Sequence, residues 1–135
     1  MIEEIASRHV ARVKHPLSQG VRAGDYVFVA GQTAVLPDGT VVTGDFEAEV
    51  RAVLDNVRHV VNEAGGSLRD VCKVTVFLGN TVLFEPMNRV YEEYFAPPYP
   101  ARSTVLAPLS DPDLRIEIEA VAYIPAGGQS RQRTQ

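Results

Sequence analysis

The alternation of side-chain type along residues 114–124 constrains the fold more than any other feature of the sequence. Successive side chains of a β-strand point to opposite faces, so a period of two separates two surfaces. The first surface is apolar throughout: Ile116, Ile118, Ala120 and Ala122. The second surface mixes charged and apolar residues: Arg115, Glu117, Glu119, Val121 and Tyr123. The pattern predicts a strand with one face buried in the core. The second face carries apolar residues beside its charges, so it need not be fully exposed to solvent.

A helix over residues 46–64 is predicted to cover the buried face. Its apolar residues recur at intervals of three and four: Phe46, Val50, Val53, Leu54, Val57, Val60 and Val61. Asp45 is suited to accept hydrogen bonds from the first turn, and Gly65 and Gly66 are suited to end the helix. The many valines lower the intrinsic helix propensity, so packing against a sheet must supply the stability.

A second helix is predicted over residues 84–95. Pro86 is compatible with the first turn of a helix, where no intrahelical hydrogen bond is lost, and Pro97 follows the predicted end. One side of this helix is mainly apolar and carries Phe84, Met87, Asn88, Tyr91 and Phe95. Asn88 stands out there, because a buried amide must find hydrogen-bond partners. Bonding to a neighbouring backbone group and lining a pocket are both consistent with this position.

Three further strands complete the predicted sheet, over residues 26–31, 71–78 and 101–109. A turn at residues 37–39, Pro-Asp-Gly, is expected to join a short strand pair. The order of elements predicts an α+β fold: a single-layer mixed sheet with two helices on one face. Two helices cannot cover both faces of such a sheet, so we expect other subunits to cover the second face.

Composition narrows the function classes. The 135 residues fit one domain, and 45% of them are hydrophobic, which is enough for a core. The net charge is -4 and the basic residues are scattered, which disfavours nucleic-acid binding. The chain has no apolar run of membrane-spanning length and no secretory signal, so we expect a cytoplasmic protein that does not enter membranes. The polar residues 125–135 are predicted to form a flexible tail.

Several kinds of active site are not indicated. The three histidines, at positions 9, 15 and 59, do not show metal-ligand spacing, and no phosphate-binding glycine loop or nucleophile-elbow motif occurs. The single cysteine, Cys72, lies within a predicted strand and is expected to be an inert core thiol. We therefore predict no metal and no cofactor, and chemistry carried by arginine, carboxylate, amide and backbone groups.

The remaining candidates are Arg102, Asn88, Gly31 and one of the two glutamates at 117 and 119. A guanidinium binds a carboxylate through two parallel hydrogen bonds, and a glutamate in a cleft can orient or deprotonate water. Gly31 follows an apolar strand and permits close approach of a ligand or side chain. Taken singly, each is also consistent with an ordinary structural position, and periodicity does not choose between the two glutamates.

Five segments, taken together, resemble the RidA/YjgF family of reactive-intermediate deaminases. The resemblance spans about residues 15–124 and supports one RidA-like domain over residues 1–124. Its segments are SQGVRAGDYVFVAGQ (18–32), LDNVRHVVNEAGGSLRDVCKVTVFL (54–78), MNRVYEEYF (87–95), YPARSTV (99–105) and IEIEAVA (116–122). Their order and spacing carry the resemblance, because each segment alone is a weak signal.

The resemblance implies a chorismate-mutase-like subunit of a homotrimer, with substrate clefts between subunits. It implies hydrolysis of 2-imino or 2-enamino acids, such as 2-aminoacrylate and 2-aminocrotonate, to 2-oxo acids and ammonia without a cofactor. By this resemblance Arg102 binds the substrate carboxylate and Glu117 positions the attacking water. Asn88 and Gly31 line the same cleft.

Three cleft positions depart from the family pattern. Many members carry tyrosine, serine and cysteine where this chain carries Leu17, Ala30 and Thr104. The first two differences remove hydroxyls, so a larger or more apolar imino acid, for example an aminomuconate-like intermediate, is an alternative substrate. A protein that binds small carboxylates without converting them is the second alternative.

Overall fold

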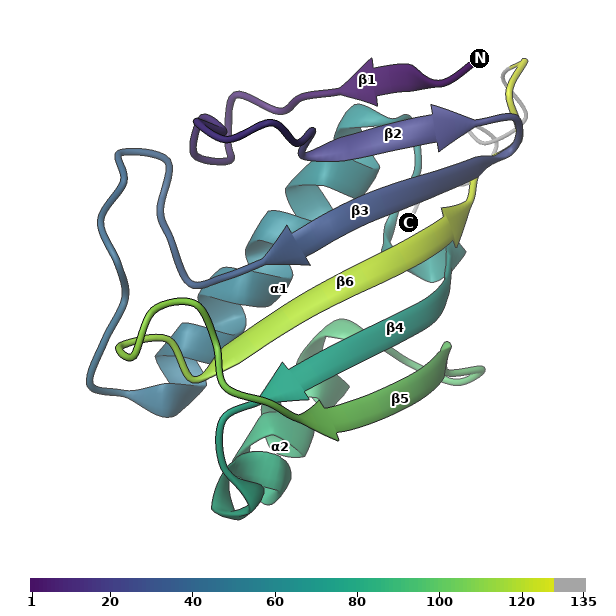
Figure 1. Cartoon of the computed structure of the whole chain (residues 1–135). Helices are drawn as coiled ribbons and strands as arrows, with labels where there is room; N and C mark the ends of the chain where they lie inside the picture. Colours follow the sequence, from purple (N-terminus) through teal and green to yellow (C-terminus); the bar gives the residue numbers. More distant parts are fainter. Residues whose placement is uncertain (128–135) are drawn as a thin grey trace.

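The computed structural model describes residues 1–127, which form one twisted six-stranded sheet with two α-helices on one face (Figure 1). The strands are β1 (Glu3–Ile5), β2 (Gly20–Ala23), β3 (Tyr26–Gln32), β4 (Val71–Leu78), β5 (Ala101–Leu106) and β6 (Ile116–Tyr123). The helices are α1 (Phe46–Glu63) and α2 (Phe84–Tyr94), with short 3-10 turns at Leu68–Asp70 and Thr81–Leu83. The predicted mixed single-layer sheet is confirmed.

The strand order β1-β2-β3-β6-β4-β5 places the last strand at the centre of the sheet. All neighbouring pairs are antiparallel except β4 and β5, which are parallel because α2 carries the chain back across the sheet between them. The predicted apolar face of β6 lies against the helices, where its Ile116, Ile118, Ala120 and Ala122 are all buried. β6 therefore determines which sheet face becomes core.

Helix α1 begins and ends where the sequence pattern predicts. The Asp45 side chain accepts hydrogen bonds from the backbone N–H groups of Glu47 and Ala48, at 3.0 and 3.4 Å. The helix ends at Glu63, and Gly65 follows with φ of +94°, a conformation that favours glycine. Six of its apolar residues have no exposed surface: Val50, Val53, Leu54, Val57, Val60 and Val61.

Some predictions are wrong in detail. The sequence analysis missed β1 and β2, the fifth strand ends at Leu106 instead of 109, and the strand pair around residues 37–39 is a single bridge between Val35 and Val41. Cys72 is exposed and is not a core thiol. A register shift between Val71 and Lys73 changes the phase of alternation, so Cys72 turns away from the helices.

The predicted flexible tail starts at residue 125, and residues 128–135 lie outside the part of the chain that the structure describes. Within residues 1–127, neither helix combines the length and the apolar character that a membrane crossing requires.

An ion pair between the fully buried Glu49 and the partly exposed Arg115 ties α1 to the start of β6. The Glu49 carboxylate has no exposed surface and accepts hydrogen bonds from the Arg115 backbone N–H at 2.8 Å and from its Nε at 3.0 Å. A buried carboxylate that loses its cationic partner keeps the cost of its lost hydration. This pair anchors the end of the strand that carries Glu117.

We expect Arg115→Met to lower the free energy of unfolding by roughly 3 kcal/mol, since it leaves the Glu49 charge buried with only a backbone donor. Urea unfolding measures the change. Arg58→Met is the matched control, because Arg58 pairs with Asp55 at the surface, where both side chains are about 40% exposed. A control variant as unstable as Arg115→Met would contradict the assignment.

Candidate functional site

Arg102 and Thr104 project from β5 toward the helix side of the sheet. Arg102 is paired in register with Val74, and Val74 with Ala120, and both of these neighbours are buried beneath the helices. Side chains in one such row share a face. Thr104 lies two residues further along β5 and therefore faces the same way, and both residues are partly exposed at this edge of the sheet.

The Arg102 guanidinium is held by aromatic rings and a thioether instead of a carboxylate. Its central carbon lies 4.8 Å from the ring centroid of Tyr91 and 5.7 Å from that of Phe84. Its Nη1 lies 3.9 Å from the sulfur of Met87. Across residues 1–127 no carboxylate lies within ion-pairing distance of this group. Stacking fixes the orientation of the guanidinium and leaves most of its N–H donors available to a ligand.

Asn88 and Arg102 line the same cavity. This cavity, the arginine pocket, has a volume of about 410 Å³. Its lining residues are Glu85, Asn88, Arg89, Tyr91, Glu92, Tyr99, Pro100 and Arg102. Asn88 is partly exposed and belongs to this lining. Asn88 thus lies at a pocket, and its role in binding a substrate stays a prediction.

Glu117 and Gly31 meet on the opposite, helix-free face of the sheet. Glu117 is paired in register with Phe77, and Phe77 with Val105, and none of these three residues belongs to the buried core. A Cβ built on Gly31 would overlap Glu117 Oε2 and lie 2.9 Å from Glu117 Cδ. The carboxylate therefore occupies the space that a side chain at position 31 would fill. The register shift in β3 between Val29 and Gln32 produces this close approach.

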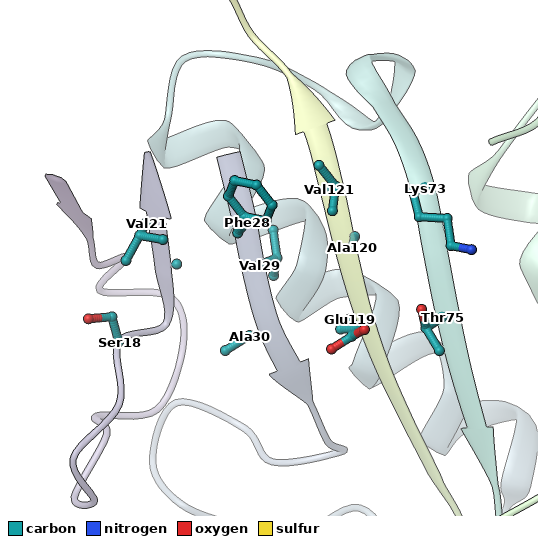
Figure 2. A pocket seen from close by; sticks show the side chains of 11 residues that line it. Ser18, Val21, Phe28, Val29, Ala30, Lys73, Thr75, Glu119, Ala120 and Val121 are labelled. Atoms are coloured by element: carbon teal, nitrogen blue, oxygen red, sulfur yellow. The ribbon is translucent and has the colours of Figure 1, made fainter. Parts of the chain in front are cut away.

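The pKa of Glu117 is raised above the ordinary value of 4.5. Burial is the main cause, and the negative charge of Glu119 is the second. Glu119 is exposed and lines a neighbouring cavity of about 340 Å³ on the helix-free face, together with Ala30, Lys73 and Thr75 (Figure 2). The structure thus separates the two glutamates: Glu117 is the partly buried one beside Gly31.

Leu17, Ala30 and Gly31 share another cavity, of about 360 Å³, between β3 and the segment before β2. Two buried amides hold its walls. Gln19 Oε1 accepts a hydrogen bond from the Ser7 N–H at 2.7 Å, and Asn56 Nδ2 donates to the carbonyls of Thr33 and Val35, both at 3.0 Å. The sequence analysis missed both residues. Asn56 had a detectable signal, because it lies three residues after Val53 and four before Val60, on the mainly apolar side of α1.

The candidate residues therefore form two groups that do not meet within one chain. Arg102, Thr104 and Asn88 lie at the β5 edge on the helix side. Glu117, Gly31, Ala30 and Leu17 lie around β3 and β6, and we call this second group the glutamate side. Neither the arginine pocket nor the two cavities lined by Glu119 and by Leu17 contains members of both groups. The same residues contain no cluster of three or more histidine, cysteine or acidic side chains fit to hold a metal ion.

Comparison with known proteins agrees with this fold. The crystal structure of Escherichia coli TdcF with bound serine aligns with a TM-score of 0.83 and 35% identity over 90% of this chain and 98% of that one. Residues 8–124 match the family described as Endoribonuclease L-PSP. The chain belongs to this family, which is the RidA/YjgF family.

Proteins of related sequence align with nearly the whole length of this chain. A RutC family protein of Pyrococcus horikoshii is 42% identical over 91% of this chain and 98% of its own length. The 2-iminobutanoate/2-iminopropanoate deaminase of Escherichia coli K12 is 36% identical over 90% of this chain and 98% of its own length. Relatives at this level of similarity support a RidA-type deaminase.

Gly31→Ala is expected to fold but to displace the Glu117 carboxylate, because the new methyl group takes its place while the flexible side chain can swing aside. If Glu117 acts as a base, kcat should fall by roughly 100-fold or more, with the melting temperature nearly unchanged. Gly79→Ala is the control, since a Cβ there meets its nearest atom at 3.6 Å, an ordinary contact. Full activity of Gly31→Ala would show that the position of the Glu117 carboxylate does not matter for catalysis.

The charge of Glu119 should shift the acid limb of the pH profile for imine hydrolysis. Only ionised Glu117 can accept a proton, so kcat/KM should decrease as the pH falls through its raised pKa. Glu119→Gln removes a like charge, lowers the pKa of Glu117 and should move this limb to lower pH. Rates measured across the acid range test the shift, with the remote Glu63→Gln as control. An acid limb at the same pH in all three proteins would contradict the coupling.

Proposed function

We propose that this protein hydrolyses 2-imino acids, and the 2-enamino acids in equilibrium with them, to 2-oxo acids and ammonia. The observation that carries the proposal is the Arg102 guanidinium, which lies in a cavity with no carboxylate partner among residues 1–127. A planar cation of this kind fits the carboxylate of a small acid. The solved TdcF structure contains bound serine, and the Escherichia coli deaminase is named for two 2-imino acids.

The proposed reaction uses Glu117 to handle one proton. Glu117 removes a proton from water while the water oxygen attacks the imine carbon, and the imine nitrogen takes up a proton from solvent; Glu117 then returns its proton to solvent. The resulting carbinolamine then loses ammonia as its C–N bond breaks and the C=O bond of the 2-oxo acid forms. The raised pKa of Glu117 moves it toward neutral pH, where a group exchanges protons most effectively. Arg102 contributes by fixing the orientation of the substrate.

The arginine pocket and the glutamate side must then come from two different subunits. The helix-free face carries exposed apolar side chains, including Tyr26, Phe28, Val105 and Tyr123, each between 42% and 45% exposed. A contiguous apolar patch on a sheet face is typical of a subunit interface. We propose a homotrimer in which this face is covered and Arg102 of one copy approaches Glu117 of the next.

The identity of the substrate side chain depends on the glutamate side. Leu17 is 54% exposed and lines the same cavity as Ala30 and Gly31, so an apolar surface stands beside the proposed reacting atoms. This lining supports the second candidate, a deaminase of an imino acid with a longer or bulkier side chain. The coupled assay below, run with imino acids of increasing size, separates it from a deaminase of the smallest ones.

Although the family is described as Endoribonuclease L-PSP, the charge distribution of this chain does not favour RNA as a substrate. RNA binding relies on clustered basic groups that neutralise several phosphates. The arginine pocket contains two guanidinium groups, and that of Arg89 lies 3.3 Å from the Glu47 carboxylate. With a net charge of -4, the chain offers little to a polyanion beyond Arg102 itself.

Arg102→Ala and Glu117→Gln should each lose most of the activity, by roughly 100-fold or more. Turnover is followed as 2-oxo acid formed when a dehydratase releases 2-aminoacrylate or 2-aminocrotonate. If the site lies between subunits, mixing the two inactive variants and refolding them together should restore activity. In a random trimer about one site in four then receives both native groups.

Size-exclusion chromatography with light scattering is the companion measurement, because all three proteins must have the same mass. Arg69→Ala, outside both groups, is the control and should retain full activity. Equal turnover by wild type and Arg102→Ala would refute the proposed role of Arg102. Mixed variants that stay inactive would refute the site between subunits. Binding of 2-oxobutanoate without any turnover would favour the carboxylate-binding alternative.

A further inference from the structure

Tyr91 carries a buried hydroxyl that the proposed reaction leaves unused. The residue is 5% exposed, and its hydroxyl oxygen is buried without a hydrogen-bond partner among residues 1–127. Buried hydroxyls are nearly always paired, because an unpaired one has lost its hydration without compensation. Phenylalanine would fill the same volume without this penalty. The hydroxyl therefore calls for a role outside the packing of the core.

The surroundings of Tyr91 point to the arginine pocket. Its ring lines that pocket and lies under the Arg102 guanidinium, 4.8 Å from its central carbon. On another side it packs against the Phe95 ring at 4.6 Å between centroids, which offers no hydrogen bond. Burial raises the pKa of the Tyr91 hydroxyl above its ordinary value of 10, and the charge of Arg102 and the interaction of its N–H groups with the hydroxyl oxygen oppose this only in part. The group therefore remains a protonated O–H donor at neutral pH.

We propose that the Tyr91 hydroxyl donates a second hydrogen bond to the carboxylate that Arg102 binds, which makes Tyr91 a substrate-binding residue. This inference rests on the proposed function and adds a residue to that site. A carboxylate has two oxygens with about four acceptor positions, so one guanidinium does not saturate it. Tyr91 and Arg102 line the same pocket and their side chains are in contact, so an anion held by the guanidinium lies close to the Tyr91 hydroxyl.

Helix α2 contains a second tyrosine that serves as an internal comparison. Tyr94, three residues further along, donates its hydroxyl hydrogen to Asp55 Oδ1 at 2.8 Å and also lies 3.3 Å from the Arg51 carbonyl oxygen. Its hydroxyl thus has partners within the fold and stabilises the contact between α2 and α1. The two tyrosines share a helix, and only Tyr91 has a hydroxyl without a partner and a place in the arginine pocket.

The test replaces each hydroxyl in turn. Tyr91→Phe keeps the ring and its stacking on Arg102 but removes the donor. We expect its KM for a 2-imino acid, and its Kd for 2-oxobutanoate measured by calorimetry, to rise roughly 10-fold or more. Its kcat should change little, and its melting temperature should stay the same or rise. Tyr94→Phe should show the reverse: a lower melting temperature with KM and Kd near the wild-type values.

Each outcome decides the inference. Wild-type KM and Kd in Tyr91→Phe would overturn it, and so would a rise in Kd accompanied by a loss of thermal stability like that of Tyr94→Phe, which indicates a structural role. The calorimetric Kd needs no turnover, so it distinguishes two failures. A wild type that binds 2-oxobutanoate but hydrolyses no imine refutes the proposed function and still tests Tyr91. A wild type that binds no 2-oxo acid overturns both.

Discussion

The two-sided β6 strand at the centre of the sheet is the constraint on which the rest of the structure depends. Its apolar side is buried under α1 and α2, and its other side presents Glu117 beside Gly31. One strand thus anchors the hydrophobic core and carries the candidate base. The ion pair between Glu49 and Arg115 fixes the start of this strand to α1. A register slip of one residue would bury the glutamates and expose the isoleucines, so the core itself enforces the placement of Glu117.

The environment of Arg102 differs from that of the arginines that stabilise the surface. Arg51 and Arg58 lie within 2.8 Å of a carboxylate oxygen, and Arg115 pairs with buried Glu49. Arg102 instead rests on the rings of Tyr91 and Phe84. An internal carboxylate would compete directly with an anionic ligand for the same N–H donors, whereas an aromatic ring orients the guanidinium without occupying them. This choice of partner is the physical basis for proposing a carboxylate substrate.

Much of the site was predictable, for reasons that differ from residue to residue. Asn88 stood out because an amide is unexpected in the mainly apolar side of α2, and it lies in the pocket of Arg102. Glu117 and Glu119 were indistinguishable by periodicity, and only the β3 register shift beside Gly31 separates them. Cys72 was misassigned because the register shift between β4 and β6 cannot be recognised from the order of apolar and polar residues along β4. Tyr91 read as an ordinary core residue, since nothing in a sequence reveals whether a hydroxyl finds a partner.

The sequence by itself determined the local elements, because helical and strand periodicity, an aspartate cap and a terminating glycine act over a few residues. It also determined, through resemblance, the family to which the chain belongs. Only the tertiary structure decided that Arg102 and Glu117 lie on opposite faces of one sheet. That outcome follows from strand order and register, which pair β5 with β4 and β4 with β6. Such pairings join residues far apart in the chain. No short-range sequence pattern therefore determines which residues of different strands lie on the same face of the sheet.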